Sequence, residues 1–140
     1  MIKYALLPIA GLMMAGIAHA QPAEAINSQI LLKTTSSWDG TPYVAYPQGQ
    51  PELTVRKVTM APGSSFDWHS HPMPAAGYVV SGELIVQARD SDKTVTLTAG
   101  QVLPEMNNIV HRGLSGNSPT ELIVFYAGTP GMPISVEPAN

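Results

Sequence analysis

The sequence contains no cysteine among its 140 residues. This absence excludes a disulfide framework, an iron–sulfur cluster and a lipid-modified amino-terminal cysteine. Charged residues make up only 12% of the chain, and the formal net charge is −3 with no basic cluster, so nucleic acid is not an expected partner. Apolar periods at helical spacing are also short, none of them longer than about two turns. Stability must therefore come from a packed core in a largely non-helical fold.

The first twenty residues, 1–20, have the pattern of a secretory signal peptide. Lys3 precedes an apolar run, Ala5 to Ile17, that is too short to span a bilayer and is followed by a small-residue triplet ending at Ala20. A retained membrane anchor is the alternative, but a proline and two glycines weaken the run as a spanning helix. We predict cleavage after Ala20, a periplasmic or secreted protein, and no later membrane segment.

The remaining chain divides into three parts. Residues 21–50 are expected to form an arm with the first strands, residues 51–128 a single β-barrel, and residues 129–140 a tail that wraps or adds an edge strand. Short β-branched or aromatic runs recur throughout, each closed by Gly, Pro, Asn or Ser. The predicted strands cover residues 30–34, 43–46, 53–60, 66–71, 77–80, 83–89, 94–98, 101–103, 109–114, 121–127 and 134–136. This rhythm predicts an all-β sandwich or barrel.

Three local features add detail to that barrel. Ser81-Gly82 separates two apolar runs and predicts a two-residue hairpin. The apolar phase changes at Arg56-Lys57, which predicts a bulge or a bend. Leu122 to Ala127 is apolar on both faces, so it is either a central strand or a strand whose outer face contacts a second copy.

The segment Trp68 to Pro72 carries the chemistry. His69 and His71 are separated by one residue, so on a strand both imidazoles point to one face, about 7 Å apart along the chain. The one other histidine after the predicted cleavage site is His111. Three imidazoles suit iron, zinc, copper or nickel, whereas magnesium and calcium prefer oxygen ligands. We predict a divalent transition metal held by His69, His71 and His111.

These residues resemble the two sequence motifs of the cupins, and in particular the small single-domain cupins of the conserved-barrel type. The matching positions are Gly63, His69, His71 and Gly82 in the first motif and Gly100 and His111 in the second. The resemblance implies a cupin-type β-barrel, a double-stranded jelly roll of two packed antiparallel sheets. It also implies that the three histidines converge on one metal inside that barrel.

The sequence departs from the family pattern in two places. The metal-binding glutamate of the first motif would fall at Ala75, or at Ala76 on the longer spacing. Asp67, Glu105 or a water molecule could take its place, and a soft thioether from Met73 or Met106 is a further candidate, although packing is the favoured role for both methionines.

The turn of the second motif also differs from the family pattern. In place of Pro-x-Gly the sequence reads Met106-Asn107-Asn108. Asparagine tolerates the left-handed backbone conformation that glycine adopts in such turns, so Asn108 can still make this one.

Three functions remain open from the sequence. Three-histidine iron cupins include dioxygenases of thiols and diketones, so the resemblance implies a dioxygenase or an isomerase acting on a small organic substrate. The alternatives are a module that binds a metal or small ligand without turnover, and a metal-free barrel that serves protein contact. No catalytic residue can be assigned. Small cupins of this type often pair, and the apolar strand Leu122 to Ala127 agrees with a homodimer.

Overall fold

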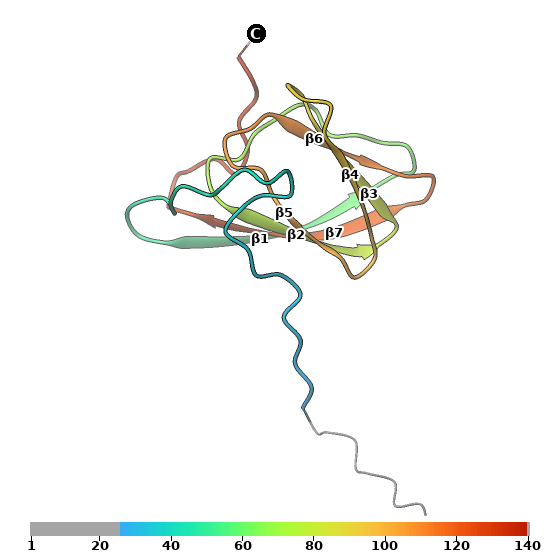
Figure 1. The fold of residues 1–140 in the computed structure, drawn as a ribbon, viewed down its shortest axis with the longest axis horizontal. Helices are drawn as coiled ribbons and strands as arrows, with labels where there is room; N and C mark the ends of the chain where they lie inside the picture. The colour runs from blue at the N-terminus through green and yellow to red at the C-terminus, as the bar shows by residue number, and fades with distance from the viewer. Residues whose placement is uncertain (1–25, 140) are drawn as a thin grey trace, which may run out of the picture.

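The structure, a computed structural model, describes residues 26–139 and contains seven strands in two facing antiparallel sheets (Figure 1). The strands are β1 (Glu52–Met60), β2 (Ala75–Ser81), β3 (Glu83–Ala88), β4 (Thr94–Thr98), β5 (Val102–Pro104), β6 (His111–Ser115) and β7 (Thr120–Gly128). The first sheet has the order β1-β7-β2-β5 and the second the order β4-β3-β6. The predicted all-β fold of two antiparallel sheets is confirmed.

No helix occurs within residues 26–139, so this part of the chain offers no helix that could cross a membrane. The predicted signal peptide, residues 1–20, lies outside the described residues, and export stays a prediction.

The predicted strands at 30–34 and 43–46 are wrong. Residues 35–43 of this arm instead form a turn. A single bridge joins Ser36 and Pro42, and Tyr43 N donates to the Thr35 carbonyl oxygen at 2.9 Å. The first residues of the arm extend away from the barrel (Figure 1), and Ile30 is 75% exposed. An apolar run without a neighbouring strand to pair with cannot complete its backbone hydrogen bonds as a strand.

The predicted strand at 66–71 exists as a looser ladder beside β6. Phe66 N donates to the Gly113 carbonyl oxygen at 2.9 Å, and His69 and His111 form an antiparallel bridge. On its other side, Ser70 bridges Val136 of the C-terminal tail. Within the described part of the chain, the predicted strand at 134–136 makes no other backbone pairing. The segment 64–71 therefore extends the second sheet and carries the His-x-His pair with it.

Apolar side chains between the two sheets form the core. On β7, Leu122, Val124 and Tyr126 are buried and point inward, whereas Phe125 on the outer face is 40% exposed. β7 lies between β1 and β2, so it is a central strand of its sheet, but its outer face is not covered by residues 26–139. Contact of that outer face with a second copy stays a prediction.

The predicted hairpin at Ser81-Gly82 is wrong, because β2 and β3 belong to different sheets. Gly82 instead carries the chain from one sheet to the other with a φ of +78°. A side chain there would overlap the Pro119 carbonyl oxygen and Thr120. Glycine is required at this corner for both its backbone conformation and its lack of a Cβ.

Of the bulge or bend predicted in β1, the bulge is wrong, since the register of β1 with β7 is unbroken along the strand. The apolar phase change has another cause. Leu53 and Val55 point outward and are 66% and 62% exposed, whereas Val58 and Met60 point toward the core. Two separate apolar faces of one regular strand therefore produced the pattern.

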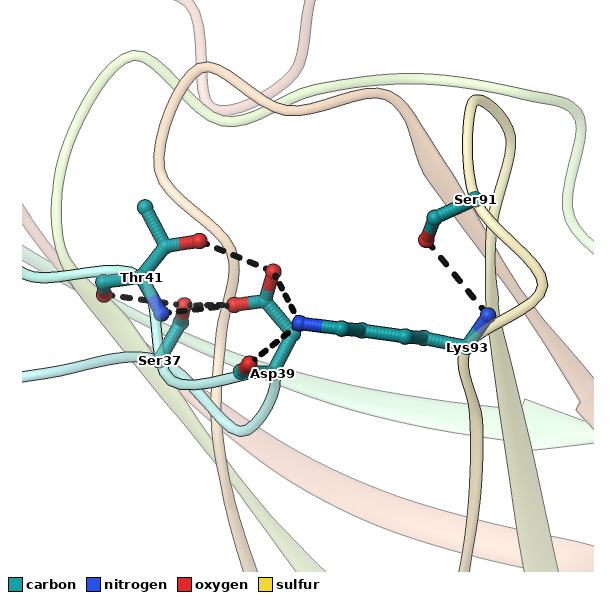
Figure 2. Close-up of polar contacts among 5 residues, drawn as sticks. All are labelled: Ser37, Asp39, Thr41, Ser91 and Lys93. Atoms are coloured by element: carbon teal, nitrogen blue, oxygen red, sulfur yellow. Dashed lines mark hydrogen bonds and ion pairs between the residues drawn. The ribbon is translucent and has the colours of Figure 1, made fainter.

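A polar turn fastens the arm to the second sheet (Figure 2). The Asp39 carboxylate accepts hydrogen bonds from Ser37 Oγ at 2.5 Å, Thr41 N at 3.0 Å and Thr41 Oγ1 at 2.8 Å. Lys93, in the β3–β4 connection, donates from Nζ to the Asp39 carbonyl oxygen at 2.7 Å. Burial of the carboxylate opposes ionisation, but these hydrogen bonds and Lys93 outweigh it and lower the pKa of Asp39.

The same turn meets the first sheet at β5. Trp38 N donates to the Pro104 carbonyl oxygen at 3.0 Å, and the Tyr43 hydroxyl donates to the Glu105 carbonyl oxygen at 2.7 Å. The arm therefore supports the end of β5, the strand that leads into the candidate site.

Candidate metal centre

A cavity of about 210 Å³ lies between the two sheets. Its apolar lining includes Val58, Leu84, Leu103 and Val124. The titratable groups that line it are Arg56, Asp67, His69, His71, Glu105, His111, Tyr126 and Glu137. A cavity with this many convergent polar groups is the first place to look for a functional site.

All three predicted histidines meet in this cavity. His69 comes from the segment beside β6, His111 opens β6, and His71 stands before β2. Their ring centroids are 4.8 to 5.1 Å apart, and one nitrogen from each ring lies within 4.8 Å of the other two. His71 and His111 are 4% and 2% exposed.

Backbone carbonyl groups fix the tautomer of each ring. Because a carbonyl oxygen can only accept, each Nδ1 that contacts one must carry a proton, so in the neutral form of each ring the Nε2 lone pair is left free. The contacts run from His69 Nδ1 to Asp67 O at 2.8 Å, from His71 Nδ1 to Ile134 O at 2.6 Å and from His111 Nδ1 to Ile109 O at 2.8 Å. This outer support is typical of metal-binding histidines.

Glu105 also points into the cluster. It is 8% exposed, and its Oε2 lies 3.3 Å from His111 Nε2. The two atoms are buried and face each other without the alignment of a hydrogen bond, so neither has a hydrogen-bond partner among the described residues. Burial opposes the Glu105 charge, but the three neighbouring imidazoles outweigh it and lower the pKa of Glu105.

The histidines differ in their electrostatics. Burial lowers the pKa of His69 and of His71. Burial also acts on His111, but contact with the Glu105 carboxylate and the bond to Ile109 O outweigh it, so the pKa of His111 is raised. Two rings are therefore held neutral and ready to bind, and the third pairs with the carboxylate.

The other sequence candidates have different roles. The Asp67 side chain is exposed, and Asp67 orients His69 through its backbone oxygen. Met73 belongs to the hydrophobic core and Met106 is 1% exposed; neither lines the cavity. Asn108 has a φ of +58° and its N–H donates to the His71 carbonyl oxygen at 2.8 Å, which confirms the predicted turn.

Sequence reasoning missed three contributors. Ile134 acts through its backbone carbonyl oxygen, and because every residue has this group, the sequence does not distinguish it. Tyr126 is 4% exposed, and its ring centroid lies 5.4 Å from that of His71. Its position two residues after Val124 and four after Leu122, on the same face of the strand, was the signal in the sequence. Arg56 lines the cavity from β1. It lies two residues before the inward-pointing Val58, so the alternation of a strand places both side chains on the same face.

The residues present fit a divalent transition metal. Three imidazole nitrogens and one carboxylate are the donors that iron, zinc, copper and nickel accept. The buried, unpartnered His111 Nε2 and Glu105 Oε2 are the atoms that a cation between them would satisfy.

The fold and the site together define a β-barrel of two facing sheets with a histidine cluster between them. Residues 56–126 match the cupin domain, and the chain belongs to the cupin family. No protein of curated function matches it in sequence.

Solved structures agree with the fold. An RmlC-like cupin from Shewanella frigidimarina is 24% identical, with 57% of this chain and 69% of that chain covered and a TM-score of 0.50. The DMSP lyase DddQ from Ruegeria pomeroyi is 18% identical over 69% of this chain and 46% of its own, with a TM-score of 0.53. An oxalate oxidase in complex with the substrate analogue glycolate is 24% identical over 59% and 45%, with a TM-score of 0.50.

Proposed function

We propose that this cupin binds one divalent transition metal through Nε2 of His69, His71 and His111 and uses it to act on a small organic molecule. The observation that carries the proposal is the set of three Nδ1–carbonyl contacts, which turn three free Nε2 lone pairs toward one point. Iron, zinc, copper and nickel all suit this donor set. Oxygenation and isomerisation are the proposed reaction types.

A bound metal would supply Lewis acidity and coordination positions for a substrate. The chain's own residues do the rest. The apolar side chains of Val58, Leu103 and Val124 surround the donor atoms, and the ring orientations are fixed in advance by backbone carbonyl groups. The similar oxalate oxidase and DMSP lyase support small-molecule chemistry in a fold of this kind.

Arg56 favours an anionic substrate. It lines the cavity from β1, and it forms no ion pair with another residue among 26–139. Its guanidinium also interacts with the Tyr126 hydroxyl, where it opposes the rise that burial causes in the pKa of Tyr126. Asp67, Glu105 and Glu137 line the same cavity and disfavour a second negative charge. A small monocarboxylate fits this balance.

Binding without turnover is the second candidate. The cavity volume of about 210 Å³ is below the range of roughly 300 to 1,000 Å³ for sites that enclose drug-sized ligands. Capture of the metal itself or of a very small ligand suits that volume.

One experiment separates the two candidates. The metal-loaded protein is incubated with a panel of thiols, β-diketones and small monocarboxylates while oxygen uptake and product formation are followed. Turnover of any of them that disappears in His71→Ala supports the enzyme. Tight binding by calorimetry with no turnover across the panel supports the binding module.

We also propose that the protein is exported and forms a homodimer. Leu53, Val55 and Phe125 lie on the outer face of adjacent strands β1 and β7 and are all at least 40% exposed, which is an apolar face that a second copy could cover. Light scattering coupled to size exclusion gives the oligomeric state, and a monomer at all concentrations would contradict the dimer.

A further inference from the structure

Glu105 stands directly opposite Ala75, the position at which the first motif lacks its carboxylate. The β2–β5 ladder pairs Ala76 with Pro104 and Gly77 with Leu103. The same register continues by one residue, because Glu105 N donates to the Ala75 carbonyl oxygen at 3.0 Å. Directly opposed residues of an antiparallel pair send their side chains to the same face, so the two positions share one space inside the barrel.

Small residues on β2 leave room for the Glu105 side chain. Ala75 is 8% exposed and Gly77 has no side chain. A Cβ at Gly77 would lie 3.7 Å from Glu105 Oε1, in ordinary van der Waals contact. The carboxylate of Glu105 therefore reaches across the ladder to the histidine cluster.

The environment of Glu105 calls for a cation. A buried carboxylate persists only when it is paired or binds a metal. The only ion-pair contact of Glu105 within residues 26–139 is with His111, at 3.3 Å, and the facing atoms Oε2 and Nε2 have no hydrogen bond. When His111 is neutral, Glu105 Oε2 and His111 Nε2 are two hydrogen-bond acceptors that face each other. A cation bound to both atoms would satisfy them.

We propose that Glu105 is the fourth protein ligand of the metal: the carboxylate of the site is supplied from the end of β5 in place of β2. This inference rests on the proposed metal centre at His69, His71 and His111. It replaces the neutral three-histidine centre expected from the sequence with one that carries an anionic ligand. The metal then has lower Lewis acidity and one fewer open position than a three-histidine centre would give it.

The arm supports this ligand. The Tyr43 hydroxyl donates to the Glu105 carbonyl oxygen at 2.7 Å, so Tyr43 is a positioning residue for Glu105. Tyr43 does not line the cavity. Tyr43→Phe is therefore a matched control, because it removes a hydrogen bond to Glu105 and keeps the Glu105 carboxylate.

The test compares metal affinity in the wild type, Glu105→Gln, Tyr43→Phe and His71→Ala, with zinc and cobalt competed against a chelator. We expect Glu105→Gln to weaken binding by more than about a hundredfold, beyond the roughly 10- to 100-fold effect of residues that act behind a ligand. Tyr43→Phe should fall within or below that smaller range. An unchanged affinity in Glu105→Gln, with binding still lost in His71→Ala, overturns the fourth ligand and leaves the proposed function standing.

A spectroscopic readout adds a test whose decisive arm uses the wild type and so does not depend on how the variants fold. The infrared difference between metal-loaded and metal-free wild type should show a shifted carboxylate stretch that persists in Glu137→Gln and is absent in Glu105→Gln. A difference spectrum of the wild type without any carboxylate shift overturns the proposal. Failure of the wild type to bind zinc or cobalt overturns both this inference and the proposed function.

Moving the carboxylate back across the ladder provides a gain-of-function test. Glu105→Ala combined with Ala75→Glu exchanges the two opposed side chains and keeps the charge. We expect the double variant to recover at least about tenfold of the affinity that Glu105→Ala loses. No recovery in a folded double variant would contradict the shared space that the ladder gives these two positions.

Discussion

His69 and His111 exchange both of their backbone hydrogen bonds, at 3.0 Å from His69 N to His111 O and at 2.8 Å in the reverse direction. They are therefore directly opposed residues of an antiparallel ladder, and their rings leave the same face with centroids 4.8 Å apart. The candidate centre is thus part of the strand pairing itself. Changes to that pairing should alter metal binding, and metal should stabilise the pairing.

Metal affinity should fall as the pH is lowered, because only a neutral imidazole binds. Burial lowers the pKa of His69 and His71, so these rings stay neutral to lower pH, whereas Glu105 raises the pKa of His111 above its usual 6.5. Protons therefore compete first at His111, and the loss of affinity begins above about pH 6.5. Competition titrations between pH 8 and pH 5 measure it; a flat profile in folded protein would rule out histidine ligation.

Replacing Gly82 should be far more damaging than replacing Gly100. Both have positive φ, +78° and +89°, but a Cβ at Gly82 meets the Pro119 carbonyl oxygen and Thr120, whereas one at Gly100 meets nothing within 4 Å. We expect Gly100→Ala to cost about 1 to 2 kcal/mol from backbone strain alone and Gly82→Ala about 4 kcal/mol or more. Urea unfolding of both variants measures the difference, and equal losses would contradict the tight corner between the sheets.

The Asp39 turn should hold the arm against the barrel. Asp39→Ala removes three hydrogen bonds to the carboxylate, and we expect it to cost about 2 kcal/mol and to increase amide exchange in residues 35–43. Lys93→Met is the comparison variant. It removes the half-exposed cation and its hydrogen bond to the Asp39 carbonyl oxygen but keeps the three bonds to the carboxylate, and it should cost about 0.5 kcal/mol. Similar exchange rates in Asp39→Ala and wild type would show that the turn does not hold the arm.

The Asp39 contribution should also depend on pH in a defined direction. The folded-state pKa of Asp39 lies below its ordinary value of 3.8. A group with a lowered pKa stabilises the fold above its unfolded pKa and loses that contribution as the pH falls through the folded value. The stability difference between wild type and Asp39→Ala should therefore be constant at neutral pH and shrink below about pH 4.

Tyr43 should titrate late and destabilise the protein at high pH. Burial, with the nearby Glu105 charge, raises its pKa from 10.0 to about 12. A raised pKa means that its contribution is complete below pH 10 and is lost as the pH rises toward 12. The difference in unfolding free energy between wild type and Tyr43→Phe, about 1 kcal/mol near neutrality, should shrink above pH 10. A difference that stays constant to pH 12 would contradict the buried hydroxyl.

The sequence predicted the barrel and the three histidines because both depend on local pattern. Alternating short apolar runs define strands wherever a neighbouring strand exists, as in β4, which matches its predicted bounds of Thr94–Thr98. The spacing of His69 and His71 places both rings on one face of an extended chain. The position of His111 in the second motif then supplies the third ring.

The predictions that were wrong share one cause. Turn residues and apolar runs indicate where strands and turns lie, but they do not determine which strands pair with each other. Gly82 has the sequence of a hairpin turn, yet the strands on either side join different sheets. Residues 30–34 have the sequence of a strand but pair with no other strand within residues 26–139. Glu105 remained one option among several, because its opposition to Ala75 depends on β2 pairing with β5, and sequence periodicity carries no information on that pairing.

Metal stoichiometry in the purified, untagged protein tests the central claim most directly. Elemental analysis should find about one transition-metal ion per chain in the wild type and less than about a tenth of that in His71→Ala and His111→Ala. Ser135→Ala, which changes an exposed residue of the cavity lining, should keep the wild-type content. A wild-type protein that carries no metal and takes up none on exposure to iron, zinc, copper or nickel would contradict the claim. His71→Ala or His111→Ala proteins that are folded and still carry about one metal ion per chain would also contradict the claim.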